Sequence, residues 1–404
     1  MGTPPAAADG REGTPRAGAP STSASPSASP SASPHVSPAP TLPATPVAPA
    51  GPVVTALAGG VGAARMLAGL AAVLGQPSIA AVINTGDDTV LHGLHVSPDI
   101  DTVTYTLAGV SNREMGWGLA GETWTVMEAL GSFDGVAGRS LTWFSLGDKD
   151  LATHLYRTGR LAEGATLSQV TADVAQRFGV GAQLLPMSDD RVETRVTLRD
   201  GHEAHGHEAH GHEAHGHEAH GHEAQTKGQP ARMPAGSPAG AVVSFQEYFV
   251  GLAHAVPVAA VDFAGIEAAR PAPGVIEAVE TADLLVICPS NPVVSIGPVL
   301  GVPGVAQAVT RRRETTVAVS PIIAGRALKG PADHMLAELG YEPTAAGVAE
   351  MWAPYAATIV IDNADAALAG RIETLGVRCV VAPSVMSGPA EAAKLAEAVL
   401  GVAP

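Results

Sequence analysis

The sequence predicts an α/β fold in which helices cover a doubly wound, mostly parallel sheet. Short apolar runs rich in Val and Ile alternate along the chain with segments of helical spacing. Continuous apolar runs are typical of strands that are covered on both faces, as the strands of a parallel sheet are. The 404 residues are 46% hydrophobic, which is enough for a substantial core. We therefore expect a Rossmann-like architecture with a smaller helical subdomain or lid.

The expected elements follow one another between residues 52 and 404. Strand-and-helix units begin at "PVVTALAGG", "SIAAVINTGDD", "ADLLVICPSNP" and "TTVAVSPII", and two further strands lie in "ATIVIDN" and "VRCVVAPS". Helices are expected over residues 62–75 and from about Pro331. Residues 145–200 contain two segments of helical spacing, "LATHLYRTGRL" and "LSQVTADVAQRFG". We assign the helical subdomain to this range.

Two low-complexity segments depart from this pattern. Residues 1–51 are almost entirely Ala, Pro, Ser, Thr and Gly, and we expect a disordered tail because they cannot bury enough apolar surface. Residues 201–240 carry the pentad "HEAHG" in tandem, between two segments, "RVETRVTL" and "AVVSFQEYFV", that resemble hairpin strands. We interpret this disordered His-rich insertion as a repeat expansion in an exposed turn. Its imidazoles could instead bind zinc or nickel.

Charge and cysteine content limit the classes of partner. A formal net charge of −16 repels nucleic acid and anionic membranes, so we expect neither as a partner. No stretch of about 20 uninterrupted apolar residues is present, and the N-terminus lacks the basic and apolar regions of a secretion signal. Cys288 and Cys379 lie in apolar runs, which favours a reducing compartment over a disulfide framework. We expect a cytoplasmic protein.

A glycine-rich loop follows the first predicted strand, in "TALAGGVGAARML". Gly59, Gly60 and Gly62 allow a tight turn and a close approach to an anion, and the next helix offers unpaired N–H groups and the positive end of its dipole. Phosphate or diphosphate is the expected ligand. The loop matches neither the dinucleotide fingerprint nor a Walker loop, so a purely structural turn is the alternative.

Acidic residues gather after the second predicted strand, in "NTGDDTVLHGLHVSPDIDT". Asp87, Asp88, Asp99 and Asp101 would repel one another unless a cation joins them, and oxygen ligands suit magnesium. Some of these carboxylates could instead cap helices, and Asp101 could cap the helix that starts at "TVTYTLAG". We favour a metal role for part of the set.

Further polar clusters lie at strand ends and helix starts, where ligands of doubly wound sheets bind. An Asx turn is the alternative for Asn291, and a solvated helix start is the alternative for the first cluster. Together the clusters suit a phosphate-rich ligand, a divalent metal and phosphoryl transfer without a covalent nucleophile. The clusters are Asp148, Lys149, Asp150 and His154; Ser188, Asp189, Asp190 and Arg191; Ser290, Asn291 and Ser295; and Arg326 with Lys329.

The motifs occur in a recognisable order. They are "GGVGAAR", "NTGDD", "SPDIDT", "LGDKDLATH", "PMSDD", "FQEYFV", "PSNPVVSIGP" and "AVSPIIAGRALKGPA". From Val53 onward, apart from the His-rich insertion, the chain resembles the 2-phospho-L-lactate transferases of coenzyme F-420 biosynthesis. The resemblance implies a transferase domain over residues 52–404. It also implies transfer of a phosphorylated three-carbon acid from a guanosine diphosphate-linked donor to the deazaflavin Fo, with release of GMP and use of Mg²⁺.

The composition, rich in Ala, Gly and Pro, suggests an actinobacterial source. Actinobacterial members of the family move phosphoenolpyruvate from enolpyruvoyl-2-diphospho-5'-guanosine to 7,8-didemethyl-8-hydroxy-5-deazariboflavin (Fo), giving dehydro coenzyme F-420-0. We expect this reaction, with phospholactate transfer as the alternative. Two other hypotheses are a nonenzymatic regulator that binds a nucleotide sugar and a metal-storage protein that uses the histidine tract. A homodimer is also expected.

The resemblance also implies roles for individual residues. Lys149 stands where family members often carry Arg, and Ala63 where many carry Gly, so these two positions depart from the pattern. The implied catalytic residues are Asp101, Asp99 and Lys149, and the implied metal ligands are Asp87, Asp88 and Asp99. The implied substrate-binding residues are Gly59, Gly60, Gly62, Asn84, Thr85, Asp148, His154, Ser188, Asp189, Ser290, Asn291, Ser295 and Ser320.

Overall fold

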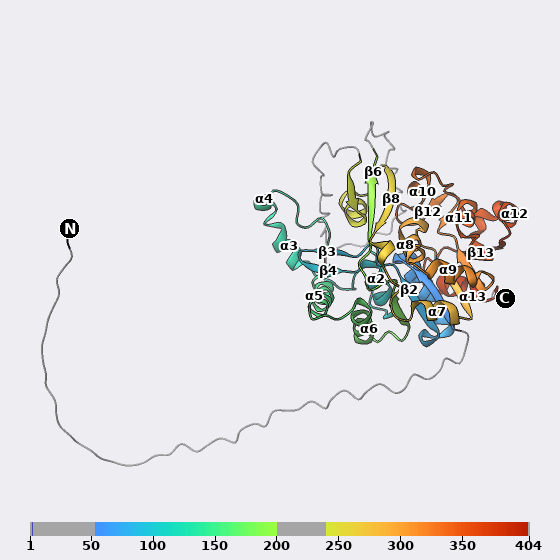
Figure 1. Ribbon diagram of the computed structural model, residues 1–404, viewed down its shortest axis with the longest axis horizontal. Coiled ribbons are helices and arrows are strands. Elements are labelled where there is room, and N and C mark those ends of the chain that lie inside the picture. The colour runs from blue at the N-terminus through green and yellow to red at the C-terminus, as the bar shows by residue number, and fades with distance from the viewer. Residues whose placement is uncertain (1, 3–52, 200–239, 403–404) are drawn as a thin grey trace, which may run out of the picture. The chain divides into compact units, whose positions relative to one another are not determined.

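Seven parallel strands form the main sheet of the computed structural model (Figure 1). Their spatial order is β14-β13-β10-β9-β1-β2-β5, and each neighbouring pair runs parallel. This confirms the predicted α/β fold with a doubly wound sheet. The strands are β1 (Val54–Ala58), β2 (Ile79–Ile83), β5 (Gln183–Pro186), β9 (Leu284–Ile287), β10 (Thr316–Val319), β13 (Thr358–Ile361) and β14 (Arg378–Val381).

The structure describes residue 2 and residues 53–199 and 240–402. The expected tail over residues 1–51 and the His-rich insertion over 201–240 therefore lie outside the described residues, apart from residues 2 and 240. Within the described ranges no single helix is long and apolar enough to span a membrane; one bent pair, Pro292–Gly301 with Val305–Arg311, reaches the length only when its parts are combined.

The strand order reverses direction beside β1. From β1 the chain moves outward through β2 to β5, then returns to β9 on the other side of β1 and continues outward through β10, β13 and β14. The loops after β1 and β9 therefore leave the sheet toward opposite sides. A crevice at such a switch point is where doubly wound sheets bind ligands.

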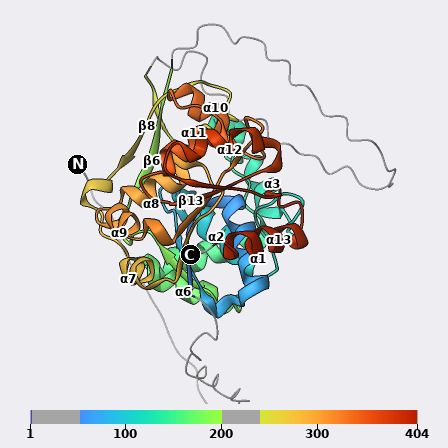
Figure 2. The ribbon, with the colours of Figure 1, turned by 90° about the vertical axis from the view of Figure 1, so that its right-hand side faces the viewer.

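Alternating residues of each central strand supply the two halves of the core. On β1, Ala56 packs with helices α1, α2 and α13, whereas Leu57 packs with helices α7, α8, α9 and α11 on the opposite face. Figure 2 shows α1 and α13 side by side. The helices are α1 (Gly60–Leu74), α2 (Pro98–Leu107), α7 (Val275–Thr281), α8 (Gly297–Gly301), α9 (Val305–Arg311), α11 (Ala345–Trp352) and α13 (Pro389–Leu400). Because both faces are covered, every residue of these strands is buried, and Val, Ile, Ala and Leu occupy all their positions except three held by Thr.

Three small antiparallel sheets lie outside the main sheet. Strands β7 and β8 pair with β6 on either side, so β6 and β7 are the expected hairpin strands that flank residues 201–240. The turn between β11 and β12 has positive φ at Ala324 and Gly325. The strands are β3 (Thr89–Leu91), β4 (Leu94–Val96), β6 (Glu193–Leu198), β7 (Val242–Ser244), β8 (Val258–Ala264), β11 (Ile322–Ile323) and β12 (Arg326–Ala327).

Residues 145–200 contain both expected helices, α5 and α6, but also β5, which joins the main sheet. The boundary of a helical subdomain stays a prediction. Helix α10 begins at Ala332, beside the expected Pro331. The remaining helices are α3 (Thr125–Gly131), α4 (Asp134–Ala137), α5 (Asp148–Ala162), α6 (Leu167–Arg177), α10 (Ala332–Glu338) and α12 (Ala369–Glu373).

The alternative in which Asp101 caps a helix is wrong. Helix α2 begins at Pro98 with Ser97 as its N-cap residue, so Asp101 lies inside the first turn and is not the cap. Pro is favoured at the first helical position because its missing N–H would have no partner there. The earlier start places the side chains of Asp99 and Asp101 within the first turn of α2, beside the switch point.

Candidate functional site

A cavity of about 440 Å³ opens at the switch point of the sheet. Its volume lies in the range of small-molecule sites. The loops after β1, β9 and β10, the first turns of α1 and α2, and residues 245–250 contribute to its walls. The cavity brings together most of the residues predicted from the sequence: Gly59, Gly60, Gly62, Asp87, Asp99, Asp101, His154, Ser290, Asn291, Ser295 and Ser320.

The glycine loop allows the chain segments after β1 and β9 to touch. A Cβ atom on Gly62 would overlap the carbonyl oxygen of Pro289, and one on Gly59 would lie 2.7 Å from Ser295 Cβ. Ser290 Oγ donates a hydrogen bond to the Gly59 carbonyl over 2.6 Å. The glycines therefore remove side-chain volume between two backbones. The same contacts hold the N-terminus of α1, which has no side-chain cap, against the cavity.

The acidic residues Asp87, Asp88 and Asp99 are held close together with raised pKa values. Burial, opposed by hydrogen bonds from Asn84 and the Gly60 backbone, raises the pKa of Asp99 to about 6. Burial likewise raises the pKa of Asp88 to about 8, and burial with the charge of Asp99 raises the pKa of Asp87 well above its ordinary value. These carboxyl groups resist ionisation because each is buried among other acids.

Two carboxylate oxygens of this group have no hydrogen-bond partner among the described residues, namely Oδ1 of Asp87 and Oδ1 of Asp88. Asp88 Oδ2 accepts a bond from Ser97 Oγ over 2.6 Å, and Asp99 Oδ2 accepts one from Asn84 Nδ2 over 3.0 Å. Buried oxygens without a partner, on acids that repel one another, are what a hard divalent cation would satisfy.

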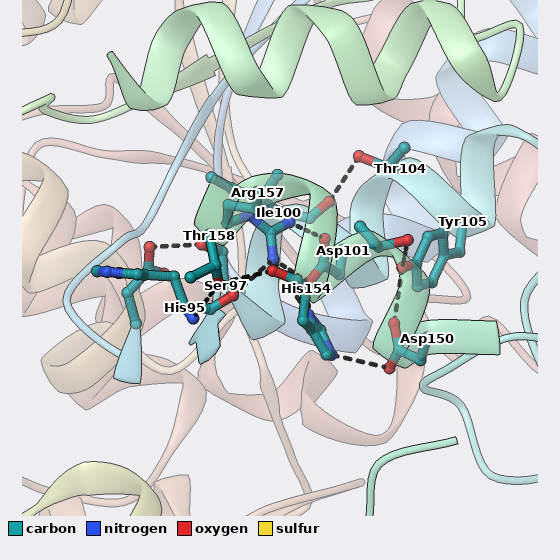
Figure 3. A network of polar contacts seen from close by, with 12 residues as sticks. His95, Ser97, Ile100, Asp101, Thr104, Tyr105, Asp150, His154, Arg157 and Thr158 are labelled. Carbon is teal, nitrogen blue, oxygen red and sulfur yellow. Dashed lines mark hydrogen bonds and ion pairs between the residues drawn. The ribbon is translucent and has the colours of Figure 1, made fainter. Parts of the chain in front are cut away.

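A second buried network joins helices α2 and α5 (Figure 3). Arg157 donates to both carboxylate oxygens of Asp101, and one of these bonds is 3.1 Å long. The ring of His154 lies between two acids: Nδ1 is 3.7 Å from Asp101 Oδ2, and Nε2 is 3.5 Å from Asp150 Oδ2. Tyr105 donates to Asp150 Oδ1 over 2.7 Å. Arg157 and His154 are each only 1% exposed, so the network is buried, and its members Asp101, Tyr105, Asp150 and His154 line the cavity.

Asp101, Asp150 and His154 also bring three metal-ligating atoms within 4.8 Å of one another. However, the Arg157 guanidinium occupies both oxygens of Asp101, and Tyr105 occupies one oxygen of Asp150. A divalent ion there would lie beside a fixed positive charge. The electrostatics therefore favour a cation near Asp87 and Asp99 over one inside this network.

Seven predicted residues do not line the cavity: Asn84, Thr85, Asp88, Asp148, Lys149, Ser188 and Asp189. Four of them have contacts away from the site. Asp148 accepts bonds from the Thr123 hydroxyl and from the amides of residues 125 and 126. Lys149 Nζ donates to the carbonyls of residues 120 and 121, over 3.0 and 2.6 Å. Ser188 donates to the Arg270 carbonyl, and Asp189 accepts from Ser168. These contacts fix loops at the ends of α5 and α6, and roles for these residues in substrate binding stay predictions.

Thr85 is buried and does not line the cavity. Asn84 is buried too, and its Nδ2 donates to Asp99, which does line the cavity. Sequence reasoning missed Arg157, although Asp150, His154 and Arg157 share one face of α5 at helical spacing. It also missed the aromatic wall formed by Trp117, Phe144, Phe245 and Phe249, whose members are far apart in the sequence.

The chain matches the model of a known protein family. The family model described as 2-phospho-L-lactate transferase CofD matches residues 54–373. The chain belongs to this family. It is therefore an enzyme, a transferase, as the sequence motifs predict.

Several relatives carry the name phosphoenolpyruvate transferase. The protein from Kitasatospora aureofaciens is 41% identical over 352 residues, which cover 87% of this chain and 97% of the relative. Those from Streptomyces coelicolor and Mycolicibacterium smegmatis are 39% and 36% identical, with 87% of this chain and 98% of each relative covered. A solved structure of a UPF0052 family protein from Bacillus halodurans covers 87% of this chain and 99% of its own, with a TM-score of 0.47 and 15% identity.

Proposed function

We propose that this enzyme transfers phosphoenolpyruvate from enolpyruvoyl-2-diphospho-5'-guanosine to Fo, which gives dehydro coenzyme F-420-0 and GMP in coenzyme F-420 biosynthesis. The observation that carries the proposal is the set of relatives named phosphoenolpyruvate transferase, which are aligned over 97–98% of their length. The site supports it, because the cavity combines a glycine-lined helix N-terminus with a cluster of buried carboxylates.

The diphosphate of the donor fits the N-terminus of α1. Gly59, Gly60 and Gly62 line the cavity there. The N-cap residue Gly59 has no side chain to cap the first N–H groups of the helix, although the Gly60 backbone bonds to Asp99. Helix N-termini bind anions through these N–H groups and through the helix dipole. Ser290, Asn291 and Ser295 of the "PSNP" segment line the same wall, where we place the rest of the guanosine diphosphate.

The residues present fit a magnesium ion held by Asp87, Asp88 and Asp99. The supporting observations are the two carboxylate oxygens without partners and the raised pKa values that mutual proximity and burial produce. When bound, Mg²⁺ would offset the negative charge of the donor diphosphate. That the bound ion is magnesium is part of the proposal.

The acceptor hydroxyl of Fo would approach the first turn of α2. In-line attack by this hydroxyl forms a new oxygen–phosphorus bond, and the bond between that phosphorus and the GMP oxygen breaks. Because Arg157 holds both oxygens of Asp101, we assign Asp101 to orienting the hydroxyl. Asp99, in the same first turn of α2, is the alternative candidate to take up the hydroxyl proton.

A turnover assay tests the proposed function. Purified enzyme is supplied with Fo, Mg²⁺ and a generating system for either the enolpyruvoyl or the lactyl form of the donor, and the deazaflavin product is identified by mass spectrometry. We expect the dehydro product from the enolpyruvoyl donor. A lactyl product alone would assign the chain to phospholactate transfer. Tight nucleotide binding without either product would favour a nonenzymatic regulator.

Without metal, the protein should lose stability as pH rises from about 5 to about 8. The pKa of Asp99 is about 6 and that of Asp88 about 8 in the folded state, both above the ordinary 3.8. Between the ordinary and raised values the folded state binds more protons than the unfolded state, so a rise in pH favours unfolding. Carboxyl groups with lowered pKa values act in the opposite direction, but at lower pH.

Thermal denaturation of the metal-free protein across this pH range measures the trend. Added Mg²⁺ should raise the Tm most at the alkaline end, since metal and protons compete for the same carboxylates. Asp99→Asn should reduce the slope of Tm against pH. A slope that is the same in wild type and Asp99→Asn would contradict the assignment. The cytoplasmic location and the homodimer stay predictions that belong to this proposal.

A further inference from the structure

The cavity contains more acidic than basic side chains. Asp87, Asp99, Asp101 and Asp150 line it, whereas Arg65 and Lys329 are the Lys and Arg side chains found among the described lining residues. Arg65 Nη1 donates to the Met386 carbonyl over 3.0 Å. A ligand with two phosphates therefore meets few positive charges in this cavity, apart from the N-terminus of α1 and a bound cation.

Lys329 is the basic side chain of the cavity without a partner in the described part of the chain. Its ammonium makes no ion pair or hydrogen bond with the described residues, and the residue is exposed. Arg326, three residues earlier, is exposed too but does not line the cavity. Arg326 and Lys329 are equivalent candidates in the sequence, but in the structure only Lys329 lines the cavity.

The position of Gly116 shows where the Lys329 ammonium lies. A Cβ atom on Gly116 would be 3.0 Å from Lys329 Nζ and 3.5 Å from Val61 Cγ1, in the first turn of α1. Lys329 and Val61 therefore both lie within 4 Å of one point beside Gly116. Gly116 itself has φ +82°, so a side chain there would be disfavoured both by backbone conformation and by the ammonium.

The hairpin that precedes Lys329 is held in place. Ala324 and Gly325 form its turn with positive φ, and the Ala324 amide donates to Asp365 Oδ2 over 3.0 Å. Strand β12 then leads through Leu328, which also lines the cavity, to Lys329 and the start of α10. Lys329 therefore lies in a four-residue connection, residues 328–331, between β12 and α10, which limits the space that the side chain can reach.

We infer that Lys329 binds the diphosphate of the donor, together with the N-terminus of α1. This inference rests on the proposed function, because it assigns a residue to the donor of that reaction. An ammonium beside helix N–H groups adds a mobile positive charge to a fixed dipole, and phosphate oxygens can accept bonds from both. Lys329 is thus a donor-binding residue, and it has no part in the transfer of the acceptor proton.

Binding of GDP in the presence of Mg²⁺ tests the inference by titration calorimetry. Wild type is compared with Lys329→Met, with Lys329→Arg and with Arg326→Met as the control on the same hairpin. We expect Lys329→Met to bind GDP roughly tenfold more weakly, with a smaller change for GMP, because an exposed charge-assisted contact to phosphate is lost. Lys329→Arg should recover most of the affinity, and Arg326→Met should stay within about twofold of wild type.

Steady-state kinetics and salt dependence separate this role from a structural one. Lys329→Met should raise KM for the donor while KM for Fo and kcat change little, and the difference in GDP affinity should shrink as salt is added. Equal GDP affinity in wild type and Lys329→Met would overturn the inference and leave the proposed function intact. A wild-type protein that binds no GDP would overturn both, which distinguishes the two failures.

Discussion

Replacing Arg157 by Met should reduce the free energy of unfolding by about 3–5 kcal/mol, the range measured when one partner of a buried ion pair is removed. Arg157 is 1% exposed and donates to both oxygens of the buried Asp101. Without the guanidinium, the Asp101 carboxylate would remain in the core beside Asp88 with no charge to balance it. Met keeps an apolar stem but not the guanidinium, so the loss combines the uncompensated charge of Asp101 with the buried space that the guanidinium leaves. Urea denaturation gives the free energies.

The matched control is Arg160→Met, one turn later on α5. Arg160 pairs with Glu163 and Asp173, but its side chain is 36% exposed, so its loss should cost no more than about 1 kcal/mol. The double variant Arg157→Met with Asp101→Asn should regain part of the lost stability, since the uncompensated charge is gone. Equal losses of unfolding free energy in Arg157→Met and Arg160→Met would show that the buried ion pair stabilises the fold no more than an exposed one does.

The strands could be predicted from the sequence because their apolar runs are local signals. Residues 284–287 are apolar at every position and residues 54–58 at every position except Thr55, whose hydroxyl donates to the Ala278 carbonyl, as burial on both faces requires. The start of α2 at Pro98 is also a local signal, because its Ser-Pro-Asp sequence is a typical helix N-terminus. This start rules out Asp101 as a cap, which the sequence had left open as an alternative.

The site could be predicted less completely, because its contacts join distant residues. The glycines of the first loop were expected to approach an anion, yet Gly62 also has to accommodate Pro289, which lies more than two hundred positions away. Similarly, nothing in the spacing of Asp101 and Arg157 indicates that they pair. Residue types identified the acidic and glycine-rich parts of the cavity, whereas the partner of each buried charge depended on the tertiary structure.

Gly62→Ala should disrupt the site more than any other single methyl group added to the glycine loop. Its Cβ would overlap the Pro289 carbonyl oxygen, a backbone atom that cannot rotate away. Either the segment after β9 or the first turn of α1 must shift, at a cost of about 1–3 kcal/mol or more for overpacking. Because displacements of about 1 Å can lower rates by about a hundredfold, kcat/KM should fall at least tenfold.

Gly159→Ala is the matched control for this change. Gly159 lies inside α5 with no atom within 4 Å of its Cβ position, so alanine should stabilise the helix by up to about 1 kcal/mol. Urea denaturation and GDP binding are measured for both variants. If Gly62→Ala bound GDP as tightly as Gly159→Ala does, the contact between the β1 and β9 loops would not be what shapes the diphosphate site. Weaker GDP binding in Gly62→Ala alone would instead tie donor binding to this point of backbone contact.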